Sequence, residues 1–135
     1  MYSQTEFLNT GVYTHNELLE LVSANVAIRK SIRNNESATT LASALSSYTS
    51  VLGYFVSGVA ATAANVASLI FAACASLSAL DRSAIVDSME NGTEQLNDIA
   101  REMTTNTVRV TIGWLKFQET ASSKAVQVVE GAACT

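Results

Sequence analysis

A stretch from Ser37 to Leu80 contains no Asp, Glu, Lys, Arg or His. About a quarter of the residues of a soluble domain are normally charged, so an uncharged stretch of this length must be largely removed from water. It can be buried in its own domain, in copies of itself, in a partner protein or in a bilayer. The choice among these four is the main question that the sequence poses about function.

The composition predicts a single folded domain made of helices. Of the 135 residues, 48% are hydrophobic and 15% are charged, so the chain can bury a core and is not disordered. It contains no proline, which is the strongest helix breaker. We therefore expect an all-α fold, a bundle of four to five helices over residues 1–135. The net charge of −4 argues against binding to nucleic acid, which needs a basic surface.

Capping residues mark two helices in the first part of the chain. Residues 1–13 are expected to form a short lead-in. Thr14 and Glu17 then have the spacing of a capping box, and the apolar residues that follow recur at helical spacing. A second helix is expected to begin near Ser37, and its apolar part is expected to continue as a long central helix to Leu80.

The apolar part of this central helix, residues 51–80, has two different faces. One face carries small residues that would let another helix approach closely. We predict this face as an interface, formed by Gly53, Ser57, Ala61, Ala64, Ser68, Ala72 and Ala75. The other face carries bulky residues, which we predict to fill the core together with two aromatic residues further along the chain. The predicted core comprises Phe55, Val59, Val66, Leu69, Leu77, Trp114 and Phe117.

The last part of the chain allows two interpretations. A short helix should end at Asn91-Gly92, and from Thr93 onward apolar residues recur at spacings of three and four. This stripe predicts a long amphipathic C-terminal helix. Residues 108–114, however, alternate between apolar and polar as a strand does, and residues 125–129 could pair with them. We favour the helix because its pattern covers the whole segment, and the β-hairpin stays the alternative for residues 106–130.

Few residues have the chemistry that catalysis requires. His15 is the only histidine, and Cys74 and Cys134 belong to no metal or redox motif. Acidic residues spaced three and four apart, from Asp87 to Glu102, lack the Glu-x-x-His pairs of di-metal bundles and suggest a solvated helix face. We therefore expect a protein that is not an enzyme and uses no cofactor or metal.

The leading hypothesis is a self-assembling or partner-binding protein that acts through helix–helix packing of residues 51–80. It would form a homo-oligomer or polymer, or bind another protein. The first alternative is a membrane-active protein, pore-forming or holin-like, that inserts the same segment into a bilayer. The second is an acidic inhibitor or adaptor that docks through Asp81 to Glu102. Because the N-terminus lacks the features of a signal peptide, we expect a cytoplasmic protein or a component of an assembly, with membrane association as the alternative.

Overall fold

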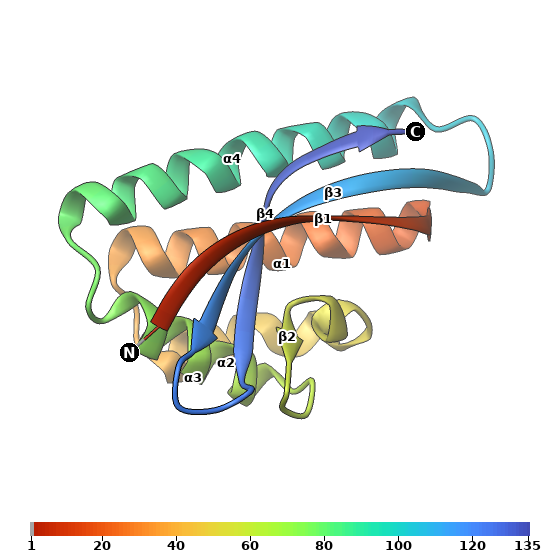
Figure 1. Cartoon of the computed structure of the whole chain (residues 1–135). Helices are drawn as coiled ribbons and strands as arrows, with labels where there is room; N and C mark the ends of the chain where they lie inside the picture. The colour runs from red at the N-terminus through yellow and green to blue at the C-terminus, as the bar shows by residue number, and fades with distance from the viewer. Residues whose placement is uncertain (1) are drawn as a thin grey trace.

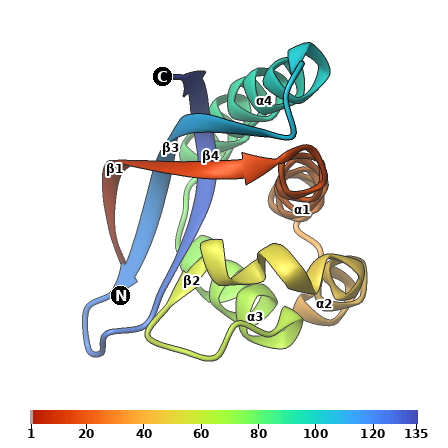
Figure 2. The same cartoon turned by 90° about the vertical axis from the view of Figure 1, so that its right-hand side faces the viewer.

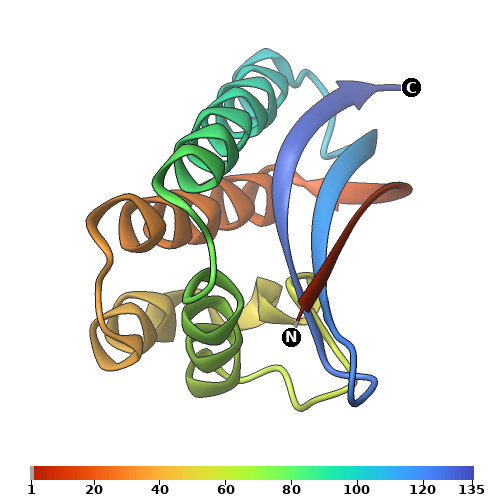
Figure 3. The ribbon, with the colours of Figure 1, turned by 60° about the vertical axis from the view of Figure 1, so that its left-hand side comes forward.

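The computed structural model describes residues 2–135 and shows a mixed α/β fold (Figure 1). A four-stranded antiparallel sheet is curved into a half-barrel, and Figures 2 and 3 show the helices gathered on one side of it. The prediction of an all-α helical bundle was therefore wrong. The error came from four segments that were expected to be helical or irregular and that instead pair as strands.

The first strand of the chain lies far in sequence from the strand with which it pairs. Their order is β1 (Tyr2–Thr14), α1 (His15–Asn34), α2 (Ala38–Leu45), the 3₁₀ helix η1 (Ser46–Tyr54), β2 (Val56–Ser57), α3 (Ala63–Cys74), α4 (Ala79–Glu102), β3 (Thr107–Glu119) and β4 (Ala125–Cys134).

The sheet has the strand order β1-β3-β4-β2, and all its pairs are antiparallel. β1 pairs with β3 over their whole length, from Tyr2 opposite Glu119 to Thr14 opposite Thr107. In the pairing of β3 with β4 the register shifts at Gly113, so that Glu130 bulges out without a partner on β3. β2 pairs with only the first two residues of β4. Most of the outer edge of β4 is therefore left without a strand.

Local sequence signals explain the first two helices. Thr14 and Glu17 form the predicted capping box at the start of α1, each side chain bonding the other residue's backbone N–H. Asn35 closes this helix in the left-handed conformation, at φ 53°. Ser37 caps α2 by accepting a hydrogen bond from the backbone N–H of Thr40, as the prediction of a helix start near Ser37 requires.

The predicted long central helix was wrong. Residues 51–80 are divided among η1, β2, a loop, α3 and the start of α4. Gly58 has φ +77° and lies so close to the backbone of Ser123 that no side chain would fit, so the chain must turn there. Thr62 then caps α3 through the backbone N–H of Asn65. The uncharged stretch is thus broken by turn and cap residues.

The predicted C-terminal helix was also wrong, and the alternative β-hairpin describes the segment. α4 continues through Asn91-Gly92, where a break was expected, and ends at Glu102. Residues 107–119 and 125–134 then form β3 and β4. The β-branched residues of β3 disfavour a helix, and a strand from the opposite end of the chain is available to pair with them. Likewise, residues 2–14 form a strand and not a lead-in.

The core lies between the curved sheet and the helices. Ala125, Val126, Val128 and Val129 of β4 are all fully buried, although neighbouring residues point to opposite faces of a strand. This half of β4 is therefore covered on both faces. Within residues 2–135, no helix has the length and apolar character needed to cross a membrane.

Candidate interaction surface

The outer edge of β4 is covered by side chains and loops. At its start, β2 pairs with it, and the Gln127 backbone N–H donates to the carbonyl of Phe55 at 2.8 Å. The side-chain amide of Gln127 donates to the carbonyl of Tyr54 at 2.6 Å. These bonds join the edge to the end of η1, so the first part of β4 has its polar backbone satisfied.

Asn25 covers the middle of this edge from α1. Its side chain is fully buried. Its Oδ1 accepts from the backbone N–H of Val129 at 2.9 Å, and its Nδ2 donates to the carbonyl of the same residue at 3.1 Å. The same Nδ2 lies 3.1 Å from the hydroxyl of Thr93 and 3.4 Å from the carbonyl of Met89. One amide therefore replaces the missing neighbouring strand at Val129 and joins α1, α4 and β4.

α4 covers the rest of the edge. The Oε1 of Gln95 accepts from the backbone N–H of Ala132 at 2.8 Å, and the Nδ2 of Asn91 donates to the carbonyl of Glu130 at 3.3 Å. The helix comes this close because Gly92 has no side chain; a Cβ there would lie 2.8 Å from the backbone of β4. From Gln127 to Ala132 the edge of β4 is thus closed to a further strand.

The outer edge of β1 has no comparable cover. Most of its residues are exposed, and the exposed fraction of the side chain reaches 76% at Leu8 and 56% at Val12. Only Tyr13 is buried, and its ring packs on Tyr54 with 5.6 Å between the centroids. In Figures 2 and 3 the first half of β1 forms the outer border of the sheet, with no helix beyond it. This strand is an open edge.

β1 also lacks the features by which natural proteins keep open edges from pairing. Such edges are usually short, or carry Pro, Lys or a bulge. β1 has 13 residues, pairs with β3 in an unbroken register, and contains only one charged residue, Glu6. Its sequence and geometry therefore favour pairing with another strand.

Glu6 borders a shallow depression of about 530 Å³ on the sheet, together with Asp87 of α4 and Glu130 of the β4 bulge. Burial, a hydrogen bond with the Glu6 side chain and the charge of Glu6 together raise the pKa of Glu130 to about 7, with burial the largest of the three causes. Near neutral pH the Glu130 carboxyl group can therefore carry a proton. The floor between them includes Gly113, whose missing side chain leaves the space open.

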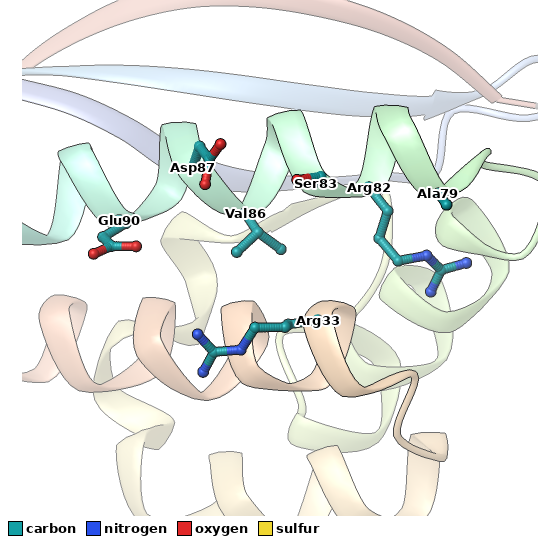
Figure 4. A pocket seen from close by; sticks show the side chains of 7 residues that line it. All are labelled: Arg33, Ala79, Arg82, Ser83, Val86, Asp87 and Glu90. Carbon is teal, nitrogen blue, oxygen red and sulfur yellow. The ribbon is translucent and has the colours of Figure 1, made fainter.

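A second depression, of about 390 Å³, lies between α1 and α4 (Figure 4). Its lining combines two cationic and two acidic side chains with three smaller ones: Arg33, Ala79, Arg82, Ser83, Val86, Asp87 and Glu90. Arg82 is already occupied, since it donates to the carbonyl of Cys74 and to Oδ1 of Asn35, both at 3.1 Å. Because the lining carries charges of both signs and Arg82 already has hydrogen-bond partners, this groove favours no particular class of ligand.

The seven residues predicted as an interface are all exposed, but they do not share one helix face. Ala64, Ser68 and Ala72 lie four residues apart along α3, beside Phe71, which is half exposed. The other four lie in η1, in β2, in the following loop and at the end of α3: Gly53, Ser57, Ala61 and Ala75. Of the predicted core residues, Val59 and Leu77 are half-buried. The other five are buried: Phe55, Val66, Leu69, Trp114 and Phe117.

The residues considered for chemistry lie apart. His15 is exposed at the first position of α1. Cys134 is exposed, whereas Cys74 is buried, and burial raises the pKa of its thiol to about 11 although the charge of Arg82 acts against the shift. Over residues 2–135, no three His, Cys, Asp or Glu side chains are grouped so that they could hold a metal ion.

Two sets of residues were missed from sequence. β1 was expected to be a lead-in, although Tyr2, Phe7, Val12 and Tyr13 are residue types that favour strands. Asn25 was not selected either. It lies at a core position of the helical pattern formed by Leu18, Leu21, Asn25, Ile28 and Ile32, and a polar residue at such a position signals a specific buried partner.

Comparison of the chain with models of protein families, with curated proteins and with solved structures finds no match in any of the three. The function is therefore inferred from the surfaces of this chain alone.

Proposed function

We propose that this protein acts by associating with polypeptides, first of all with copies of itself, and not by catalysing a reaction. One observation carries the proposal: the 13-residue strand β1 leaves its outer edge uncovered up to the buried Tyr13 and exposes Leu8 and Val12, in a sheet whose other edge is closed. Unpaired backbone groups next to apolar side chains are the surface that strand addition uses.

Sedimentation velocity and light scattering over a wide concentration range test the proposal. Association that strengthens with concentration is expected, and it should be lost in a Leu8→Lys variant that keeps its circular dichroism spectrum. A chain that stays monomeric at high concentration and retains no protein from a cell extract would remove the proposal.

A second candidate surface is the exposed small face of α3, because Ala64, Ser68 and Ala72 leave room for a close helix contact beside Phe71. If association uses this face, Ala72→Leu should weaken it while the free energy of unfolding stays the same. If β1 is used instead, the Ala72→Leu variant should associate like the wild type.

A third candidate is an acidic adaptor. The carboxylates of Asp87, Glu90, Glu94 and Asp98 are all exposed along α4. Docking through them would weaken steeply as salt is added, whereas pairing of β1 edges would respond far less.

A further inference from the structure

We infer that two copies of this chain pair through β1 in an antiparallel, two-fold arrangement with Thr10 of each copy at the symmetry axis. The inference deepens the proposed function and rests on it, since it specifies the partner and the register of the association.

The arrangement of side chains on β1 selects this register. Residues paired directly across strands point to the same face, so Leu8, Thr10 and Val12 lie on one face and Phe7 and Tyr13 on the other. With Thr10 at the axis, Leu8 of each copy faces Val12 of the second copy, and Phe7 faces Tyr13. The exposed face then matches apolar with apolar, and on the other face Phe7 lies opposite a tyrosine that is buried against Tyr54 of its own chain.

Neighbouring registers lose this match. With Leu8 at the axis, Val12 faces Gln4 of the second copy and Tyr13 faces Ser3. With Asn9 at the axis, Leu8 faces Thr10 instead. With Glu6 at the axis, two carboxylates face each other, which is unfavourable. An axis that falls between two residues would pair the face of one copy that carries Leu8 with the face of the second copy that carries Phe7.

Charge complementarity supports the same register. Arg109 lies beside Val12 on β3, is exposed, and makes no ion pair or side-chain hydrogen bond within residues 2–135. With Thr10 at the axis, Glu6 of one copy and Arg109 of the second lie on one face, diagonally two strands apart. Standard strand spacing puts their Cα atoms about 12 Å apart, a distance that these two long side chains can bridge when the Glu6 side chain turns from Glu130 toward the edge. Two-fold symmetry repeats the contact.

The residue at the axis also suits a close contact between copies. The Thr10 hydroxyl lies 2.7 Å from the hydroxyl of Thr111, and both side chains are short. Across the axis, the two Thr10 side chains would have Cβ atoms about 5 Å apart, at which threonines favour each other. Nothing bulky therefore separates the two edges at their centre.

Disulfide trapping tests the register in a Cys134→Ser background, where the buried Cys74 is the remaining native thiol. Thr10→Cys places the new thiol of one chain beside the new thiol of the second chain, close enough for the two to form a disulfide. Gln4→Cys is the matched control, because Gln4 is also exposed on the same strand and face but lies far from Gln4 of the second copy in this register. Under mild oxidation we expect covalent dimer to form about tenfold faster for Thr10→Cys than for Gln4→Cys.

A charge exchange provides a second measurement that does not depend on a cysteine. Glu6→Arg should raise the dimer Kd about tenfold, and adding Arg109→Glu should restore most of the affinity. A wild-type dimer that shows neither preferential trapping at residue 10 nor rescue by the charge exchange would overturn this register and leave the proposed self-association standing. A wild type that stays monomeric in sedimentation velocity would overturn both.

Discussion

The outer edge of β4 and the outer edge of β1 both present backbone N–H and C=O groups that face away from the sheet, but only β4 has side chains placed to bind them. On β4, the amides of Asn25, Asn91 and Gln95 bind the backbone from Val129 to Ala132. On β1, no helix of residues 2–135 lies beyond the first half of the strand, and Leu8 is its most exposed apolar residue. The edge that is closed by amides stabilises the fold, and the edge left open is available to a partner.

The largest loss of stability should come from removing the amide of Asn25. In Asn25→Leu the branched shape of the side chain is kept, but the N–H and C=O of Val129 are left buried without partners. We expect the free energy of unfolding to fall by about 3 kcal/mol, since each unsatisfied buried group costs about 1–3 kcal/mol. Urea unfolding measures this. Asn91→Ala is the control, because its single bond is exposed and should be worth about 0.5 kcal/mol.

A smaller loss is expected when α4 is pushed away from the closed edge. In Gly92→Ala the new Cβ would meet the backbone of Glu130 and Gly131 at 2.8 Å. Overpacking should cost about 2 kcal/mol, partly offset by the better helix propensity of alanine. Gly53→Ala is the matched control, since its nearest neighbour would be 3.9 Å away. Equal melting curves for the two variants would show that α4 does not press on β4.

Substitution on the open edge should leave stability nearly unchanged and act on association. Leu8→Lys places a charge on an exposed side chain, so the free energy of unfolding should stay within about 0.5 kcal/mol of the wild type. The lysine should nevertheless block pairing of β1 with a second strand. Measuring both quantities on the same variant separates the two edges: a stability loss as large as that of Asn25→Leu would mean that β1 is not a free edge.

A further effect on stability, dependent on pH, should come from Glu130, at the bulge of the closed edge. Its pKa is raised from 4.5 to about 7 in the folded chain, so the unfolded chain loses this proton first as pH rises. Between these two pKa values the folded state holds a proton that the unfolded chain has lost. The free energy of unfolding therefore falls as the pH rises through this range, and it levels off above pH 7 or so. Glu130→Gln should flatten this part of the profile. Because the side chain is partly exposed, we expect a difference of less than about 1 kcal/mol. A parallel pH profile for both proteins would show that the pair with Glu6 does not couple to folding.

Local signals predicted part of this fold correctly. The capping box of Thr14 and Glu17 and the cap at Ser37 act within a few residues of themselves, so the sequence reveals them directly. Strand pairing is different, because β1 meets its partner β3 more than ninety residues further along the chain, as Thr14 opposite Thr107 shows. In residues 107–119 the sequence therefore favoured a helix, because the apolar spacing was visible whereas the strand that pairs with the β-branched residues was not.

The candidate surface was harder to predict than the helices. The exposure of Leu8 depends on which edge the helices leave uncovered, and that follows from the packing of α1 and α4 against β4. Asn25 gave the one visible signal, as a polar residue among the buried positions of α1. Its meaning becomes clear only when Val129, more than a hundred residues away in the chain, lies beside it.

Amide hydrogen exchange, followed residue by residue at low and at high protein concentration, tests most directly whether one edge is closed and the other open. The N–H groups of Val129 and Ala132 should be protected at both concentrations, because Asn25 and Gln95 hold them within the chain. Alternate N–H groups between Glu6 and Val12 should exchange rapidly in dilute solution and become protected as the concentration rises. Protection of β1 that does not change with concentration in a proven monomer, or fast exchange at Val129, would contradict this account.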